Sequence, residues 1–243
     1  MRHSLWRLCP LLCWALVIAG AAHADNPLQH NGVDRVYDPY VQATEKELEL
    51  RTLYQKDARP GEDGILRQRL AYGFSLNERV FLEAYAIAKK LPQQSMGLEA
   101  YELEAKWQLT EQGQYSADWG LLLEYERKVG ESAAEFSAAL LGSRQWGAWV
   151  GTVNLGVEYE FGAAITDEVD RFLSAQWRYR YTQVLEPGLE FYADEFTRGI
   201  GPVLTGTLRG QNKNKWYWEA GLILPLNDTT PDQTLRFLLE YEF

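Results

Sequence analysis

Runs of about ten residues in which apolar and polar side chains alternate recur along most of this chain. In the run "LEAYELEAKWQL" at 98–109, one set of alternate residues is Tyr101, Leu103, Ala105, Trp107 and Leu109, and the polar residues stand between them. Leu, Glu, Ala and Lys are good helix formers, so composition alone favours a helix. A helix would mix the two sets around its circumference, whereas a strand sends them to opposite faces. The order of the residues therefore predicts a strand.

Similar runs, separated by Gly, Pro, Asn and Asp, indicate about twelve strands. Two of them are less clear, because the facing of "VFLEAYAIAKK" is ambiguous and "EFSAALL" is a weak strand. Most runs approach the roughly 9–11 residues that a tilted strand needs to cross a bilayer, whereas soluble strands are nearer 5–6 residues. We therefore expect an all-β fold, a single closed antiparallel transmembrane β-barrel, with a soluble β domain as the alternative.

The chain divides into three segments. Residues 1–24 combine Arg2 and Arg7, a short apolar run and a terminal "AHA", which is typical of a cleaved signal peptide. Residues 25–45 form a polar extension, either free in the periplasm or folded back into the lumen, and 46–243 form the barrel. Loss of the two signal-peptide arginines changes the net charge from −10 to −12, which argues against a nucleic-acid partner.

The last strand and the aromatic residues favour a membrane environment. Aromatic side chains lie near the ends of the apolar rows, as two interfacial girdles require. The chain ends in "TLRFLLEYEF", with Phe243, Tyr241, Leu239 and Phe237 at alternate positions. This pattern resembles Gram-negative outer-membrane β-barrel proteins. The resemblance implies insertion into outer-membrane lipid, with these four residues as the signal read by the barrel-assembly machinery after delivery by periplasmic chaperones.

The C-terminal "LPLNDTTPDQTLRFLLEYEF" and the strand rhythm are also similar to the putative MetA-pathway phenol-degradation and putative porin group. That resemblance implies a link to the uptake of aromatic compounds. It carries no chemical motif.

Catalytic chemistry has little support in the sequence. Only His30 survives removal of the signal peptide, and it precedes the first strand. Outer-membrane hydrolases draw on a barrel histidine as a base, so we expect no enzyme. An enzyme that uses carboxylates alone stays open. "GIGPV" at 199–203 lacks the strand-to-helix context of a dinucleotide loop, and we expect no cofactor.

Charged residues recur on the polar faces of the strands, and we expect them to line the lumen. They are Arg51, Arg67, Arg69, Glu102, Glu104, Lys106, Glu124, Glu126, Glu158, Glu160, Arg178, Arg180, Glu219, Arg236 and Glu240. Carboxylates two residues apart could hold hard cations. We instead expect them to pair with arginines and lysines of neighbouring strands, and we predict no metal site.

The function that these features favour is a narrow passive channel or small-solute transporter with a charged lumen. The connections between strands are short, which gives poor ground for a large recognition surface. A non-conducting barrel that serves as a structural partner in an envelope complex is the main alternative.

Overall fold

A computed structural model describes residues 32–59, 61–163, 165–210 and 214–243. The predicted signal peptide at 1–24 lies outside the described residues, as does the first part of the predicted extension.

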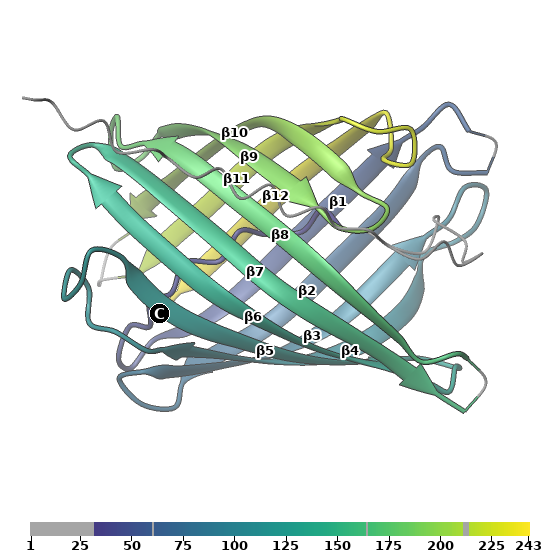
Figure 1. Ribbon diagram of the computed structural model, residues 1–243, viewed down its shortest axis with the longest axis horizontal. Helices are drawn as coiled ribbons and strands as arrows, with labels where there is room; N and C mark the ends of the chain where they lie inside the picture. Colours follow the sequence, from purple (N-terminus) through teal and green to yellow (C-terminus); the bar gives the residue numbers. More distant parts are fainter. Residues whose placement is uncertain (1–31, 60, 164, 211–213) are drawn as a thin grey trace, which may run out of the picture.

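Twelve antiparallel strands form one closed barrel, as predicted (Figure 1). The strands are β1 Lys46–Lys56, β2 Ile65–Ser75, β3 Val80–Lys90, β4 Gly97–Gln108, β5 Asp118–Lys128, β6 Ala133–Trp146, β7 Trp149–Gly162, β8 Glu168–Tyr179, β9 Glu186–Ala193, β10 Arg198–Arg209, β11 Lys215–Pro225 and β12 Gln233–Glu242. The segment expected to be a weak strand is part of β6, which at 14 residues is among the longest strands. Its pairing with β5 and β7 over most of its length compensates for the small residues.

The barrel closes between its first and last strands. β1 pairs with β12 from Glu47 opposite Glu242 to Lys56 opposite Gln233. Beyond the last pair, the backbone N–H of Phe243 donates to the carbonyl oxygen of Lys46 at 2.9 Å. Closure gives every strand two hydrogen-bonded neighbours, which a strand needs where no water can satisfy its backbone.

Short connections join the strands at both ends of the barrel. We call the end at which β1 begins and β12 ends the terminal end, and the opposite end the loop end. The connections after β1, β3, β5, β7, β9 and β11 lie at the loop end, and all are short.

In the described parts of the chain, no helix is long and apolar enough to cross a membrane.

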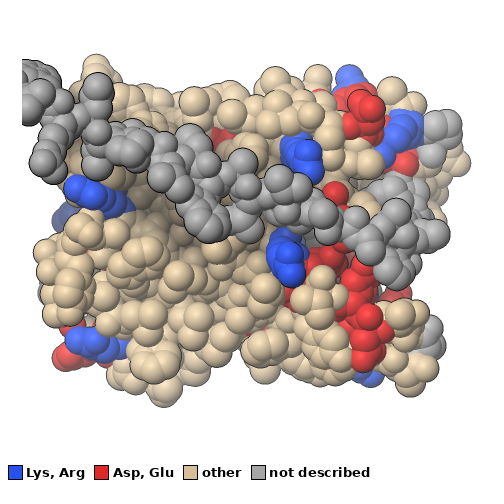
Figure 2. Space-filling model, in the orientation of Figure 1, with Lys and Arg blue, Asp and Glu red and all other residues tan. Residues whose placement is uncertain are grey.

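The outer face is apolar over the middle of the barrel. On β4, Tyr101, Leu103 and Trp107 are 55%, 62% and 50% exposed, while Glu102 and Glu104 are buried inside. Figure 2 shows a broad uncharged area between charged side chains at one end and a larger group of acidic and basic side chains that extends from the other end toward the middle. This distribution is that of a barrel whose outer surface contacts lipid.

The structure shows which residues of β3 face inward, which the sequence left ambiguous. Phe81, Glu83, Tyr85 and Ile87 are buried inside the barrel, and the small residues Ala84, Ala86 and Ala88 alternate with them. The sequence could not decide the facing because both sets are largely apolar.

Tryptophan side chains gather on the outer face near the terminal end. The Trp177 ring lies 5.2 Å from that of Trp146 and 5.8 Å from that of Trp149, centroid to centroid, and Trp149 contacts Tyr179 at 4.8 Å. Such amphipathic rings favour the boundary between lipid and water.

The apolar outer face predicts that the cost of an added charge depends on its depth in the membrane. Leu103→Arg places a charge at the middle of β4 and should lower the free energy of unfolding by about 2–4 kcal/mol, whereas Leu109→Arg, just beyond the strand end, should cost about 0–1 kcal/mol. Urea titration of protein refolded into lipid vesicles, followed by tryptophan fluorescence, measures both. Equal costs for the two variants would contradict a membrane centred on β4.

Candidate functional site: the charged lumen

Residues 32–41, which we call the lumen segment, run through the inside of the barrel from one end to the other (Figure 1). At the loop end, Gly32 packs so tightly against Asp194 that a Cβ on Gly32 would overlap its carboxylate. Val33 and Val36 pack with Leu53 and Tyr192. At the terminal end, Tyr40 donates its hydroxyl to Asp118 at 2.7 Å, and the N–H of Val41 donates to the Gln108 side chain at 2.8 Å.

Two adjacent charges fix this segment to opposite groups on the wall. Asp34 accepts from Arg51 of β1 at 2.6 Å and from Arg69 of β2 at 2.8 Å. Arg35 donates to Glu49 of β1 at 2.8 Å and contacts Glu240 of β12 at 2.5 Å. These charge-assisted bonds are stronger than neutral ones, so they hold the segment against β12, β1 and β2.

Tyr37 fixes the segment to the opposite wall. Its backbone N–H donates to Asn154 Oδ1, and its carbonyl oxygen accepts from Asn154 Nδ2, both at 2.7 Å. Its hydroxyl donates to Glu104 at 2.9 Å. Two residues on, Pro39 lies against Gly120, where a Cβ would come within 2.9 Å of the proline ring. The segment therefore crosses the lumen with partners on both sides.

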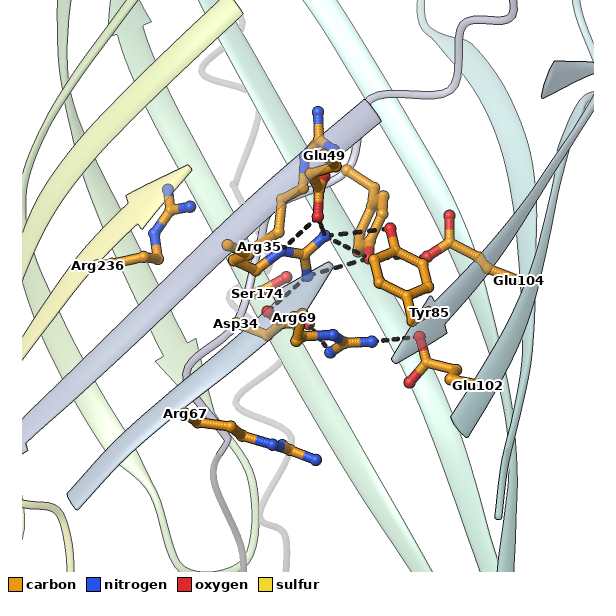
Figure 3. A network of polar contacts seen from close by, with 12 residues as sticks. Asp34, Arg35, Glu49, Arg67, Arg69, Tyr85, Glu102, Glu104, Ser174 and Arg236 are labelled. Carbon is orange, nitrogen blue, oxygen red and sulfur yellow. Dashed lines mark hydrogen bonds and ion pairs between the residues drawn. The ribbon is translucent and has the colours of Figure 1, made fainter. Parts of the chain in front are cut away.

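The lumen arginines are paired, but often not with neighbouring strands as expected. Arg236 of β12 contacts Glu219 of β11 and Glu190 of β9, each at 2.5 Å, and it is completely buried. Arg69 of β2 pairs with Glu102 of β4 (Figure 3), and Arg67 reaches Glu126 of β5 at 3.2 Å. A long guanidinium side chain reaches across the curved inner wall, so strands two or three apart come within contact distance.

Carboxylates face carboxylates on the wall from β4 to β8. In one row, Glu102 stands opposite Glu126, Glu126 opposite Glu135, and Glu135 opposite Glu160. In the adjacent row, Glu104 stands opposite Glu124, while Glu158 stands opposite Asp170. Like charges directly opposite each other destabilise a sheet. The same carboxylates give this wall a strong negative electrostatic potential.

A cavity of about 550 Å³ separates this acidic wall from the lumen segment. It opens toward the loop end, and its floor includes Asp34, Tyr37 and Asn154. Its charged lining is acidic, with eleven carboxylate side chains against four basic ones. The acidic residues are Asp34, Glu99, Glu102, Glu124, Glu126, Glu131, Glu135, Glu158, Glu160, Glu168 and Asp170, and the basic ones are Arg35, Arg67, Arg69 and Lys128.

At the terminal end, the surroundings of one carboxyl group disfavour its ionised form. Glu45 directly precedes β1. Burial, together with the nearby carboxylates of Glu47 and Glu242, raises the pKa of Glu45 to about 8. This group is mostly uncharged at neutral pH, so it adds little to the negative field at that end.

The residues predicted to line the lumen occupy several environments. Those that are buried inside are Arg51, Arg69, Glu102, Glu104, Glu126, Glu219, Arg236 and Glu240, and those that are half-buried are Arg67, Lys106, Glu124, Glu158, Glu160 and Arg178. Lys106 lies over the ring of Phe81 at 5.6 Å. Arg180 differs, because it follows the end of β8, is exposed and donates to Gln145 at 2.8 Å.

Residues 32–41 follow the lumenal one of the two placements that the sequence left open for the extension, but none of them was predicted as a site residue. Asp34, Arg35 and Tyr37 stand in "GVDRVYDPY", which has no periodicity that would place them inside. The sequence prediction also omitted Glu135, Glu190 and Asp170, although each occupies an inward position of its strand and alternation could have found it.

Comparison with known proteins shows the fold. The chain matches no protein-family model and no curated protein sequence. Its structure is similar to an outer membrane channel from Pseudomonas putida F1, with a TM-score of 0.55, 11% identity, and coverage of 86% of this chain and 98% of that one. It is also similar to the KdgM porin, with a TM-score of 0.51, 16% identity, and coverage of 81% and 98%. A second structure of that porin contains disordered oligogalacturonate. The chain therefore has the barrel fold of outer-membrane channels and porins.

Proposed function

We propose that this chain is an outer-membrane protein that acts as a narrow passive channel for small cationic solutes. The observation that carries the proposal is the cavity beside the lumen segment, where carboxylates outnumber basic groups by eleven to four. Rings of acidic side chains select cations in pores. The similarity to a channel and a porin rather than to enzymes supports transport over catalysis.

The lumen segment supplies the narrowing in this proposal. A barrel of this size encloses more space than one layer of side chains fills. The segment occupies part of that space with a backbone held on both walls. A solute would enter the acidic cavity from the loop end, and passage beyond it would require Tyr37 to leave its contacts with Glu104 of β4 and Asn154 of β7.

The resemblance to the phenol-degradation group suggests an aromatic solute instead. The cavity lining argues for a charged one, because a neutral aromatic molecule gains little from a wall of carboxylates and would strip water from them. We therefore favour a small cation or a cationic organic molecule.

A non-conducting structural barrel is the second candidate. The observation in its favour is the fixing of the lumen segment at both ends and in the middle, from Gly32 against Asp194 to Tyr40 on Asp118. In that case the segment is a permanent plug. Ion conduction separates the two candidates.

We expect the channel to prefer cations. In planar bilayers with a KCl gradient, the reversal potential should lie toward the potassium equilibrium potential, and Glu124→Gln with Glu158→Gln should shift it toward zero. The matched double variant Glu78→Gln with Glu111→Gln, which neutralises exposed carboxylates in terminal-end connections, should leave it unchanged. The preference should fade near 1 M salt, where the Debye length falls to about 3 Å. Anion selectivity in the unaltered protein would exclude the proposal.

We also propose that the C-terminal aromatic residues guide assembly. Phe237 and Phe243 face outward, and Phe243 lies at the seam between β1 and β12. Removal of Phe243 should reduce the heat-modifiable folded form in outer-membrane fractions, whereas Phe243→Trp, which keeps an aromatic end, should retain most of it. Undiminished assembly of the truncated chain would show that the signal lies elsewhere.

A further inference from the structure

Three carboxylates converge inside the barrel at the middle of β4 and β5. One oxygen from each of Glu102, Glu104 and Glu124 lies within 4.8 Å of the other two. Glu104 stands directly opposite Glu124 on β5 and opposite Glu83 on β3. Three adjacent strands thus bring acidic residues into register, an arrangement that costs free energy unless the charge is compensated.

The protein itself compensates this group only in part. Glu102 pairs with Arg69, and Glu124 accepts a hydrogen bond from Ser137 at 2.5 Å. Glu104 receives the Tyr37 hydroxyl on Oε2. Its other oxygen, Oε1, has no hydrogen-bond partner in the described part of the chain, although the Glu104 residue is only 3% exposed.

A buried carboxylate oxygen without a partner is costly, and although water could donate a hydrogen bond to it, only a proton or a cation offsets the negative charge of the three carboxylates. The neighbouring acidic groups cannot donate to it while they are ionised. A hydroxyl on each side, from Tyr37 and Ser137, supplies hydrogen bonds but no positive charge. The site therefore offers the oxygen ligands of a cation site, with too little positive charge from the protein to balance its carboxylates.

We propose that Glu102, Glu104 and Glu124 bind one hard divalent cation, with Ca²⁺ the best match. Calcium accepts oxygen ligands at about 2.3–2.6 Å in flexible geometry, so two ligands on opposite sides of it stand up to about 5 Å apart. The observed spacing of the oxygens fits that range. Mg²⁺ demands a tighter octahedral arrangement and gives up its water reluctantly.

The ion has a route to the site. Glu102 and Glu124 belong to the lining of the acidic cavity, which opens toward the loop end. The negative wall from β5 to β8 would raise the local concentration of cations along that route. Once bound, the cation would tie β4 to β5 and, through Tyr37 on Glu104, the wall to the lumen segment.

A second group of acidic residues serves as an internal comparison. Glu168, Asp170 and Glu195 also bring oxygens within 4.8 Å of one another, but all three are partly exposed and lie toward the loop end. We assign the ion to the buried group because, of these two groups, it is the one that includes a buried carboxylate oxygen, Glu104 Oε1, without a hydrogen-bond partner in the described residues.

Calcium titration of the purified full-length protein tests the site without reference to conduction. The protein, folded in detergent and freed of metal, is titrated with Ca²⁺ by calorimetry and with Tb³⁺ by luminescence excited through nearby tyrosines, of which Tyr37 bonds directly to Glu104. We expect one Ca²⁺ per chain at the buried site. Glu104→Gln and Glu124→Gln should each weaken binding by at least about tenfold, because even changes behind the ligands cost about 10- to 100-fold.

Two matched variants locate the ion. Glu99→Gln removes a carboxylate from the same strand that is already held by Arg67 and Lys89, and it should leave the affinity unchanged. Asp170→Asn disrupts the exposed group and should also leave it unchanged. Loss of binding in Asp170→Asn with retention in Glu104→Gln would place the ion at the exposed group and overturn the proposal.

Absence of Ca²⁺ binding by the unaltered protein at millimolar concentration would also overturn it, and would mean that the carboxyl groups share protons instead. Heat-modifiable migration confirms that each variant is folded. If Glu104→Gln does not fold, Glu124→Gln gives the deciding result. Neither result depends on whether the barrel conducts, so failure of this proposal and failure of the channel proposal are distinguishable.

Discussion

A chain that lacks residues 32–41 should conduct several-fold more current per channel than the unaltered protein. These residues cross the whole lumen; their side chains contact β1, β2, β4 and β12, and the backbone of Tyr37 contacts β7. Their removal leaves the inner wall of the barrel to water, which can solvate the released arginines and carboxylates. The twelve strands and the β1–β12 seam do not include any of the deleted residues, so the barrel itself should still close. Single-channel recording in planar bilayers measures the change.

A second variant keeps the lumen segment but weakens its attachment to the wall, so it distinguishes the effect of filling the lumen from the effect of holding the segment in place. Asp34→Asn with Arg35→Gln keeps the backbone in place but weakens the ion pairs to Arg51, Arg69, Glu49 and Glu240. We expect fluctuating conductance between the unaltered and the deleted levels. A deletion variant that folds but conducts at the unaltered level would show that the segment does not narrow the path.

The second large effect concerns the buried charge group around Arg236. Arg236→Met leaves Glu190 and Glu219 buried without their cation, and should lower the free energy of unfolding by about 3–5 kcal/mol. The triple variant with Glu190→Gln and Glu219→Gln should recover most of the loss, because the unpaired charges are then removed. Urea unfolding in lipid vesicles measures all three proteins.

Arg180→Met is the matched control for this experiment. Arg180 is exposed at the terminal end, and surface substitutions of this kind change stability by about 0.5 kcal/mol or less. Equal losses from Arg236→Met and Arg180→Met would contradict the view that the group around Arg236 is a desolvated structural unit.

The strands and their faces were predictable because alternation specifies both at once. Leu103 faces outward and Glu104 inward because each occupies one phase of a period of two, and a shift by one residue would put carboxylates in lipid. β3 was the exception, since alanines and large apolar residues alternate there and the pattern carries no polarity.

The site was predictable only in its composition. That Glu102 and Arg69 face the lumen follows from each strand alone, but their pairing depends on the curvature of the barrel and on strands that are not adjacent. The lumen segment was harder still. Tyr37 and Asn154 are separated by 117 residues, and Tyr37 makes the contact with its backbone N–H and carbonyl, which carry no sequence signal, to the side-chain amide of Asn154. The sequence left open whether the extension folds back into the lumen, and no local pattern decided between that placement and a free extension.

Whether the charges of the lumen line a passage or lock it is the central question, and single-channel recording of the refolded protein decides it most directly. A cation channel should give discrete, small conductance steps that carry cations in preference to anions, because a cavity remains on the acidic side of the lumen segment. Absence of any conductance, both in the unaltered protein and in the variant without residues 32–41, would contradict the channel and leave the barrel as a structural component of the envelope.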